Sequence, residues 1–187
     1  MGGGMNGEKP FEKIDPVKEP AKEPKRWELS KDGLELIKEF EGCSLKSYQD
    51  AVGVWTIGYG KIVYADGSRV QEGQLCTKEQ AERWLLEDVE KEGAHFVRLW
   101  APIENQNQFD ALCSFTFNRG AGRLRELLAT QDILNHIRDY DWAGKDKKYL
   151  EGLARRRAAE WLFFQGKPYS ELMTIEGWRA WKEKNPK

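Results

Sequence analysis

The chain has 187 residues, of which 40% are hydrophobic and 12% aromatic, and a formal net charge of −1. This length can bury one good core, or two small lobes that share one. The composition shows no broad basic excess for nucleic-acid binding, no apolar run near the roughly 20 residues of a membrane span, and no recognisable secretory signal.

Residues 1–28 are expected to form an arm, and residues 29–187 the folded domain. The arm begins with the glycine-rich Met1-Gly2-Gly3-Gly4-Met5 and repeats Lys-Glu-Pro at 18–20 and 22–24. Mixed charge with spaced prolines cannot bury a core, so we expect an extended or disordered segment. The arm could be a native linker to another module or a leader that is not native.

The first predicted helix runs from about Ser30, a plausible N-cap, to Glu41, with Gly42 just past its end. Its apolar stripe consists of Leu34, Ile37 and Phe40. Glu41 would lie in the last turn, where the helix carries partial negative charge. That charge and apolar neighbours would both favour the protonated carboxyl, which suits a general acid.

Asp50 lies in different surroundings from Glu41. It ends a polar turn that leads into a strand, so we expect a solvated, ionised carboxylate. Glycine-punctuated strands are predicted at about 47–70, and Thr56 within them could hold a water through its hydroxyl. Two carboxylates whose environments favour opposite protonation states are typical of acid/base catalysis. The alternative is that both carboxylates are ordinary surface charges.

The second part of the chain is predicted to be helical. A capping-box pattern at Thr77-Lys78-Glu79-Gln80 predicts a helix to about Trp100, which Gly93 could kink. Pro102 ends this helix. Further helices are expected at 105–117, 124–142 and 153–164.

Most of the tryptophans are expected to pack in the core. Those on helical stretches are Trp84, Trp100, Trp142 and Trp161. Trp178 and Trp181 are three apart and share a helix face, which we expect to pack against the helical lobe. Binding of a sugar or a partner protein to this face is the alternative.

Three cysteines leave an odd one out of any single disulfide, and their spacing matches no zinc site. They are Cys43, Cys76 and Cys113. We expect free thiols in a reducing cytoplasm. A redox switch at Cys43, two residues from Glu41, is the alternative.

Three motifs in order resemble the phage-type lysozymes, the muramidase family of phage endolysins. Eight residues separate Glu41 from Asp50 and five separate Asp50 from Thr56, as in the family motif. The other matching strings are Trp55-Thr56-Ile57-Gly58-Tyr59-Gly60, Phe115-Thr116-Phe117-Asn118-Arg119-Gly120-Ala121-Gly122 and the arginine-rich 152–160. The resemblance runs from about residue 29 to about residue 166.

The resemblance implies an α+β, lysozyme-like two-lobed fold. A small β-containing N-terminal lobe would be joined by a long helix to a mainly helical C-terminal lobe, with a groove between them. The implied activity is hydrolysis of β-1,4 bonds between N-acetylmuramic acid and N-acetylglucosamine in bacterial peptidoglycan, for host cell lysis. The outcome would be inverting, and no cofactor or metal is implied.

The resemblance also implies roles for individual residues. Glu41 would protonate the glycosidic oxygen, Asp50 would be the second carboxylate, and Thr56 would help to position the water. One arginine of Arg155–Arg157 would contact Glu41, although the sequence leaves open which one. The expected lining of the sugar groove is Gly60, Ile62, Phe117 and Asn118.

The chain departs from the family at Lys61, where relatives usually have a histidine that pairs with an acidic residue and helps to hold the two lobes. Lysine can keep such a charge pair, but it does not titrate near neutral pH. We expect a monomer that reaches periplasmic peptidoglycan from the host cytoplasm after membrane permeabilisation.

Three other functions stay open at this point. A lytic transglycosylase would cleave the same bond with one glutamate, leaving Asp50 and Thr56 without a role. A non-catalytic peptidoglycan-binding module would keep the groove without the chemistry. A virion-associated lysozyme would penetrate the wall with the same chemistry.

Overall fold

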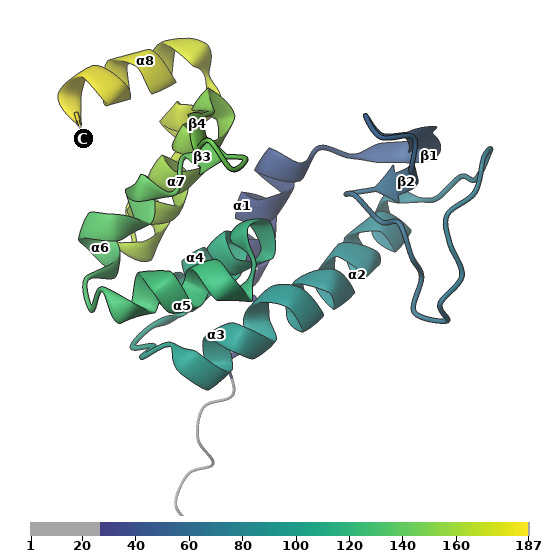
Figure 1. Ribbon diagram of the computed structural model, residues 1–187, viewed down its shortest axis with the longest axis horizontal. Helices are drawn as coiled ribbons and strands as arrows, with labels where there is room; N and C mark the ends of the chain where they lie inside the picture. The colour runs from purple at the N-terminus through teal and green to yellow at the C-terminus, as the bar shows by residue number, and fades with distance from the viewer. Residues whose placement is uncertain (1–26, 187) are drawn as a thin grey trace, which may run out of the picture.

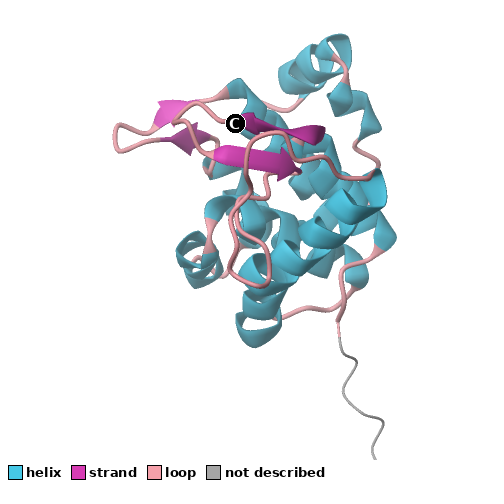
Figure 2. Cartoon of the chain, turned by 90° about the vertical axis from the view of Figure 1, so that its right-hand side faces the viewer, coloured by secondary structure: helices cyan, strands magenta, loops and turns pink. Residues whose placement is uncertain are grey.

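The computed structural model describes residues 27–186. Helices make up most of this part, and a two-stranded sheet lies near its N-terminal end, so the predicted α+β class is confirmed. The strands β1 (Ser44–Gln49) and β2 (Trp55–Gly58) lie at one end of the molecule in Figure 1, and most of the helices lie at the other. The helix α2 (Lys78–Val89) runs between these two parts. In Figure 2 the strands occupy the upper half of the view.

The predicted arm falls outside the described residues except for Trp27 and Glu28. Trp27 stacks on Phe109, with 6.1 Å between the ring centroids. The carbonyl of Trp27 accepts a hydrogen bond from Arg98, and that of Glu28 accepts one from Gln106. Trp27 and Glu28 therefore both contact the helical part of the molecule.

Helix α1 (Lys31–Glu41) begins and ends at the predicted caps. The Ser30 hydroxyl accepts a hydrogen bond from the backbone N–H of Gly33 at 3.1 Å and donates one to Asp110 at 2.5 Å. A Cβ at Gly33 would lie 2.6 Å from the Asp110 carboxyl carbon, so this close contact requires glycine. Gly42 ends the helix with a φ of 65°. The same cap thus starts α1 and ties it to the helix that carries Asp110.

Strands β1 and β2 form an antiparallel hairpin that starts earlier than predicted, at Ser44. Tyr48 pairs with Thr56, and the register is irregular between Ser44 and Tyr48. After Gly58 the predicted strand region contains only isolated bridges in this structure, such as the one between Val63 and Arg69. The prediction of strands at about 47–70 is therefore right as far as Gly58 and wrong from there to residue 70.

The predicted capping box of α2 is present, since the Thr77 hydroxyl and the Gln80 side chain each accept a hydrogen bond from the other residue's backbone N–H. The helix continues through a π-helical segment, η1 (Glu90–Ala94), into α3 (His95–Trp100). Gly93, which was predicted to kink the helix, lies in this segment. The irregularity is therefore a wider helical turn and not a break.

Helix α4 (Gln106–Arg119) starts where a helix is predicted, with Asn105 as its N-cap, and is buried from Phe109 to Thr116. The next helix, α5 (Ala121–Ala129), ends well before residue 142. The shorter elements after it are α6 (Ile133–His136), η2 (Ile137–Asp139) and the hairpin strands β3 (Trp142–Ala143) and β4 (Lys148–Tyr149). A single helix at 124–142 is thus a wrong prediction.

The last elements are α7 (Glu151–Phe164), η3 (Ser170–Met173) and α8 (Ile175–Lys184). Trp178 on α8 is 5% exposed and stacks on Trp181, so the predicted packing of this helix face is confirmed. The core consists of one cluster around α1, α2, α4 and α5 and a second cluster around α1, α7 and α8.

The four tryptophans predicted to pack in the core are each half-buried, and two of them pack against it as predicted. Trp100 and Trp161 pack against the main cluster, and Trp84 contacts Tyr64. The three cysteines are free, as predicted, with Cys43 exposed. Burial raises the pKa of the Cys113 thiol well above its usual range.

Candidate active site

Glu41 is the last residue of α1, and its side chain is 23% exposed. Its Oε1 atom lies 2.5 Å from Nη1 of Arg156 on α7. The structure thus assigns Arg156 as the arginine beside Glu41. The sequence predicts apolar neighbours for Glu41, but it does not predict this guanidinium contact. Arg156 gives the carboxyl both a hydrogen-bond donor and a counter-charge.

Arg156 is held in place by contacts on the far side from Glu41. It is 3% exposed, donates to Glu160 through Nε at 3.2 Å and donates to the backbone carbonyl of Ser114 through Nη2 at 3.3 Å. Glu160 also accepts from the Ser114 hydroxyl and from Arg157, both at 2.7 Å. Because each partner is buried, the network fixes the guanidinium that faces Glu41.

Arg157 is fully buried, and this burial lowers its pKa to about 10. Among residues 27–186, Arg157 forms a hydrogen bond with Glu160 alone, so the charge of Glu160 faces two arginines, Arg156 and Arg157. Sequence reasoning did not find Ser114 or Glu160. The available signal was the spacing of Glu160, three and four residues after two arginines on a predicted helix, which places all three within reach of each other.

Asp50 follows β1 in the polar turn that the sequence predicts. Its Oδ1 atom accepts hydrogen bonds from the backbone N–H groups of Val52 at 2.9 Å and Val54 at 2.8 Å. Gly53 has a φ of 82°, which lets the chain turn between Val52 and Val54. These donors hold one carboxylate oxygen and leave Oδ2 available for water or substrate.

Thr56 lies on β2 directly opposite Tyr48 of β1 and is 4% exposed. Its hydroxyl donates a hydrogen bond to the carbonyl of Val54 at 3.1 Å. Because the proton is used in this way, the oxygen lone pairs are left to accept a hydrogen bond. Thr56 and Asp50 are thus supported by the same short turn.

The other predicted site residues come from both parts of the molecule. Gly60, with a φ of 99°, and Ile62, which is 36% exposed, follow β2. Phe117 and Asn118 are half-buried in the last turn of α4. The side-chain amide oxygen of Asn118, Oδ1, is buried and has no hydrogen-bond partner among the described residues.

The predicted charge pair at Lys61 is confirmed. Lys61 Nζ lies 2.6 Å from Oδ1 of Asp88 on α2, and the two side chains are 7% and 28% exposed. Lys61 also pairs through its backbone with Ile57 of β2. The ion pair therefore fastens the chain after β2 to the helix that joins the two lobes.

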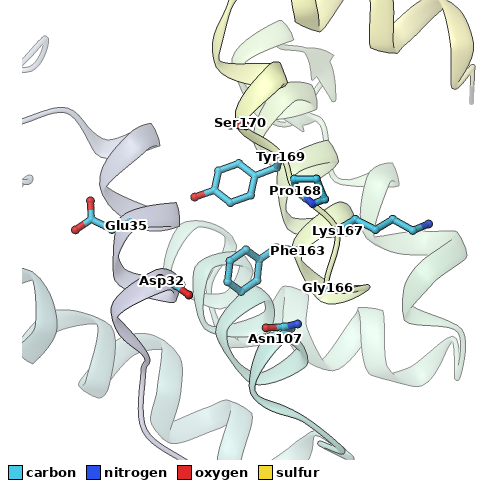
Figure 3. Close-up of a pocket in the computed structure, with 9 residues that line it drawn as sticks. All are labelled: Asp32, Glu35, Asn107, Phe163, Gly166, Lys167, Pro168, Tyr169 and Ser170. Atoms are coloured by element: carbon cyan, nitrogen blue, oxygen red, sulfur yellow. The ribbon is translucent and has the colours of Figure 1, made fainter.

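A pocket of about 530 Å³ lies away from these residues (Figure 3). It includes Asp32, nine residues before Glu41 and therefore about 13 Å away along α1. Tyr169 points across the pocket toward Glu35. None of the predicted site residues lines it. The lining residues are Asp32, Glu35, Asn107, Phe163, Gly166, Lys167, Pro168, Tyr169 and Ser170.

Residues 27–186 contain no group of three or more His, Cys, Asp or Glu side chains placed to hold a metal ion. Over the same range, none of the helices combines the length and the apolar composition needed to span a membrane.

Comparison with known proteins identifies the family. The family described as phage lysozyme matches residues 38–160, which contain Glu41, Asp50, Thr56 and Arg156. The chain belongs to the phage lysozyme family.

Individual relatives agree with this assignment. The endolysin of Salmonella phage P22 is 37% identical over 147 residues, which are 73% of this chain and 97% of the relative. The endolysin of Acyrthosiphon pisum secondary endosymbiont phage 1 is 33% identical over 152 residues, with the same two coverages. The structure of an endolysin from Escherichia coli O157:H7 phage FAHEc1 superposes with a TM-score of 0.63 at 34% identity, covering 75% of this chain and 96% of that chain.

Proposed function

We propose that this phage lysozyme hydrolyses the β-1,4 bond between N-acetylmuramic acid and N-acetylglucosamine, with Glu41 as the general acid. The family makes it a glycoside hydrolase that degrades peptidoglycan for host cell lysis. The observation that carries the residue assignment is the contact of Glu41, at the end of α1, with Arg156 of α7. The hairpin of β1 and β2, with Asp50 in its turn and Thr56 on β2, begins three residues after Glu41, at Ser44.

Glu41 can give its proton to the leaving oxygen while it stays bound to Arg156. Arg156 donates to Oε1, so a protonated Glu41 has its second oxygen free to carry the proton toward the substrate. After transfer, the carboxylate formed lies against the guanidinium, which stabilises the new negative charge. Proton transfer from a positioned acid of this kind contributes about 10²- to 10⁴-fold in rate.

Asp50 and Thr56 are proposed to act on the water. Oδ1 of Asp50 is held by two backbone N–H groups, so the other oxygen can accept a proton from a water molecule. The Thr56 oxygen can accept a second hydrogen bond from the same water and orient it. Attack from the face opposite the leaving group would invert the anomeric carbon, and inverting enzymes have carboxyl groups about 6.5–9.5 Å apart.

The sugar chain is proposed to lie between the two lobes. Gly60 and Ile62 would form one wall, and Phe117 and Asn118 the other. The side-chain oxygen Oδ1 of Asn118 is buried and has no hydrogen-bond partner among the described residues, so it would accept a hydrogen bond from an amide or hydroxyl of the sugar once the side chain turns toward the groove. The Lys61–Asp88 ion pair would keep the first wall in place relative to α2.

The place of action follows from the substrate. The protein acts on the cell wall, and we propose that it leaves the host cytoplasm as a monomer once the membrane is permeabilised. The virion-associated alternative predicts instead that the protein is found in purified phage particles.

Analysis of digested peptidoglycan tests the reaction. Hydrolysis adds a water and gives a reducing N-acetylmuramic acid end, which mass spectrometry detects. A lytic transglycosylase would give an anhydro product, and a pure binding module would give no product. NMR of the first-formed anomer tests inversion, because a retained β-anomer would exclude the proposed role of Asp50.

A further inference from the structure

Lys38, on α1, forms ion pairs with two carboxylates that lie on different helices. Its Nζ atom is 2.7 Å from Oε1 of Glu35 on α1 and 2.7 Å from Oε1 of Glu82 on α2. The Lys38 side chain is 12% exposed, and those of Glu82 and Glu35 are 30% and 49% exposed. Among residues 27–186, the pair of Lys38 with Glu82 is the one salt bridge that joins α1 to α2.

The ammonium group of Lys38 keeps its charge in this position. Burial opposes the charge, but hydrogen bonds to Glu35 and Glu82 outweigh this effect and raise the pKa of Lys38 well above its usual value. Because the group is largely withdrawn from solvent, its pair with Glu82 is screened less than a surface pair. The contact can therefore hold the two helices together more firmly than an exposed ion pair could.

On α1, Lys38 lies one turn before the proposed general acid, Glu41. Positions three apart share a side of a helix and are about 4.5 Å apart along its axis. From α7, Arg156 contacts Glu41, and its guanidinium also lies 5.7 Å from the ring centroid of Phe40. The last turn of α1 is thus held by α7 through Arg156 and by α2 through Lys38.

On α2, Glu82 is the neighbour of Ala81, which supports the end of strand β2. A Cβ at Gly58, the last residue of β2, would lie 3.1 Å from the Cβ of Ala81 and 3.4 Å from its Cα. The strand therefore lies directly against α2 at this point, and Figure 1 shows the hairpin at this end of α2. Thr56 is two residues before Gly58 on the same strand. Two adjacent residues of α2 thus contact the helix that ends in Glu41 and the strand that carries Thr56.

The proposed reaction depends on the distance between the acid and the hairpin. An inverting glycosidase needs its two carboxyl groups about 6.5–9.5 Å apart, and a misplacement of about 1 Å can cost about 10²-fold in rate. We propose that Lys38 is a positioning residue for the reaction. By holding Glu82, it sets where Glu41 lies relative to the hairpin. This rests on the proposed function, because it takes Glu41 as the general acid and Asp50 and Thr56 as the residues that act on the water.

Steady-state kinetics on soluble, uncrosslinked glycan strands of peptidoglycan test this proposal. Lys38→Met keeps most of the side-chain length but removes the charge, so the end of α1 loses its fixed position against α2. We expect kcat to fall by about tenfold. KM should change little, because the proposed sugar-lining residues are untouched. Lys38→Arg can still pair with Glu82 and should restore kcat to near the wild-type value.

A double-mutant cycle separates positioning from the cost of an unpaired charge. Glu82→Gln should lower kcat by about the same factor as Lys38→Met, and the double variant Lys38→Met/Glu82→Gln should lower it no further. Because the double variant leaves neither charge of this pair without its partner, its free energy of unfolding should recover in part, whereas kcat should not. Glu82 is partly exposed, so Glu82→Gln also covers the case in which Lys38→Met does not fold.

Glu35 provides the matched control. Glu35→Gln removes the other carboxylate that Lys38 contacts, but it leaves the pair between α1 and α2 intact. Its kcat should therefore stay at the wild-type value. An equal loss of kcat in Glu35→Gln and Glu82→Gln would contradict the proposal, because the contact with α2 would then have no special role.

The outcomes separate this proposal from the proposed function. If the wild type cleaves no glycan, the proposed function fails and the positioning role fails with it. If the wild type cleaves glycan and the folded Lys38→Met and Glu82→Gln variants keep its kcat, the function stands and the positioning role is refuted. A lower free energy of unfolding at an unchanged kcat would mean that the pair only stabilises the fold. A change confined to KM would likewise refute positioning of the acid.

Discussion

At the scale of single residues, Glu41 depends on a partner that is far away in the chain. Arg156 is 115 positions later, yet its guanidinium binds the Glu41 carboxyl. The sequence could locate Glu41, because the local motif and the helix end are visible in it. It could not choose among Arg155, Arg156 and Arg157, because consecutive helical residues point about 100° apart and only packing decides which one faces α1.

The Lys61–Asp88 pair should contribute measurably to stability. Asp88→Asn leaves a lysine that is 7% exposed without its counter-charge, so the free energy of unfolding should fall by about 2–3 kcal/mol. Lys61→Met combined with Asp88→Asn should lose less than the sum of the two single variants. Urea unfolding of the four proteins gives the coupling energy, which we expect to exceed about 1 kcal/mol.

An exposed ion pair provides the control for that cycle. Lys182 and Glu151 lie 3.2 Å apart with side chains that are 49% and 60% exposed. Their coupling energy should stay below about 1 kcal/mol because solvent screens it. Equal couplings for the two pairs would contradict the view that Lys61 fastens the lobes.

At the scale of elements, the sequence predicts where helices begin better than it predicts where a helical region is interrupted. Ser30 and Thr77 form the caps that the sequence predicts, and Asn105 caps the helix that is predicted to begin there. The break after α5 depends on Gln131, which has a φ of 58°, and on Asp132, whose side chain caps α6. The prediction of one helix at 124–142 did not use the cap signal of Asp132, and the chain forms α5, α6 and η2 there instead.

Gly93 in η1 should not tolerate a side chain. A Cβ at this position would lie 3.0 Å from the backbone carbonyl of Cys113 in α4. Gly93→Ala should therefore lower the free energy of unfolding by about 1–3 kcal/mol, although alanine is the better helix former. Denaturant unfolding measures the change.

Gly152 in the first turn of α7 is the matched control. A Cβ there would have no neighbour within 4 Å, so Gly152→Ala should be neutral or stabilising by up to about 1 kcal/mol. Equal effects of the two alanines would mean that packing against α4 does not select glycine at position 93.

At the scale of the whole molecule, α1 contributes to both core clusters and so joins one cluster to the other. The lobes and their order followed from the resemblance and from the helix signals between residues 30 and 164. The assembly around α8 did not, because the family match ends at residue 160 and no motif describes the later chain. Only the shared helix face of Trp178 and Trp181 predicted that α8 packs inward.

Tyr169 links the end of the chain to α1 and should make stability depend on alkaline pH. Burial, and next the charges of Glu39, Glu35 and Asp32, raise its pKa to about 12. The unfolded chain, with a tyrosine pKa near 10, therefore loses this proton first as the pH rises. The stabilising contribution is complete below about pH 10 and is lost between about pH 10 and 12.

Tyr169→Phe should remove this part of the alkaline decline. The difference in the free energy of unfolding between the wild type and Tyr169→Phe should shrink as the pH rises from about 9 to 11.5, measured by urea unfolding. Tyr48→Phe, at an exposed position on strand β1, is the control, because it removes a tyrosine hydroxyl that is not buried. A constant difference across this range would show that Tyr169 does not keep its proton longer in the folded state.

The most direct test of the account is the rate at which Glu41→Gln clears permeabilised Gram-negative cells, compared with Glu39→Gln. Glutamine keeps the size of the side chain but carries no acidic proton, so turnover should fall by about 10²-fold or more. Glu39 is exposed on the same helix two residues earlier, and its variant should retain activity close to that of the wild type. If folded Glu41→Gln lyses cells at the wild-type rate, Glu41 is not the acid and the assignment of the site is wrong.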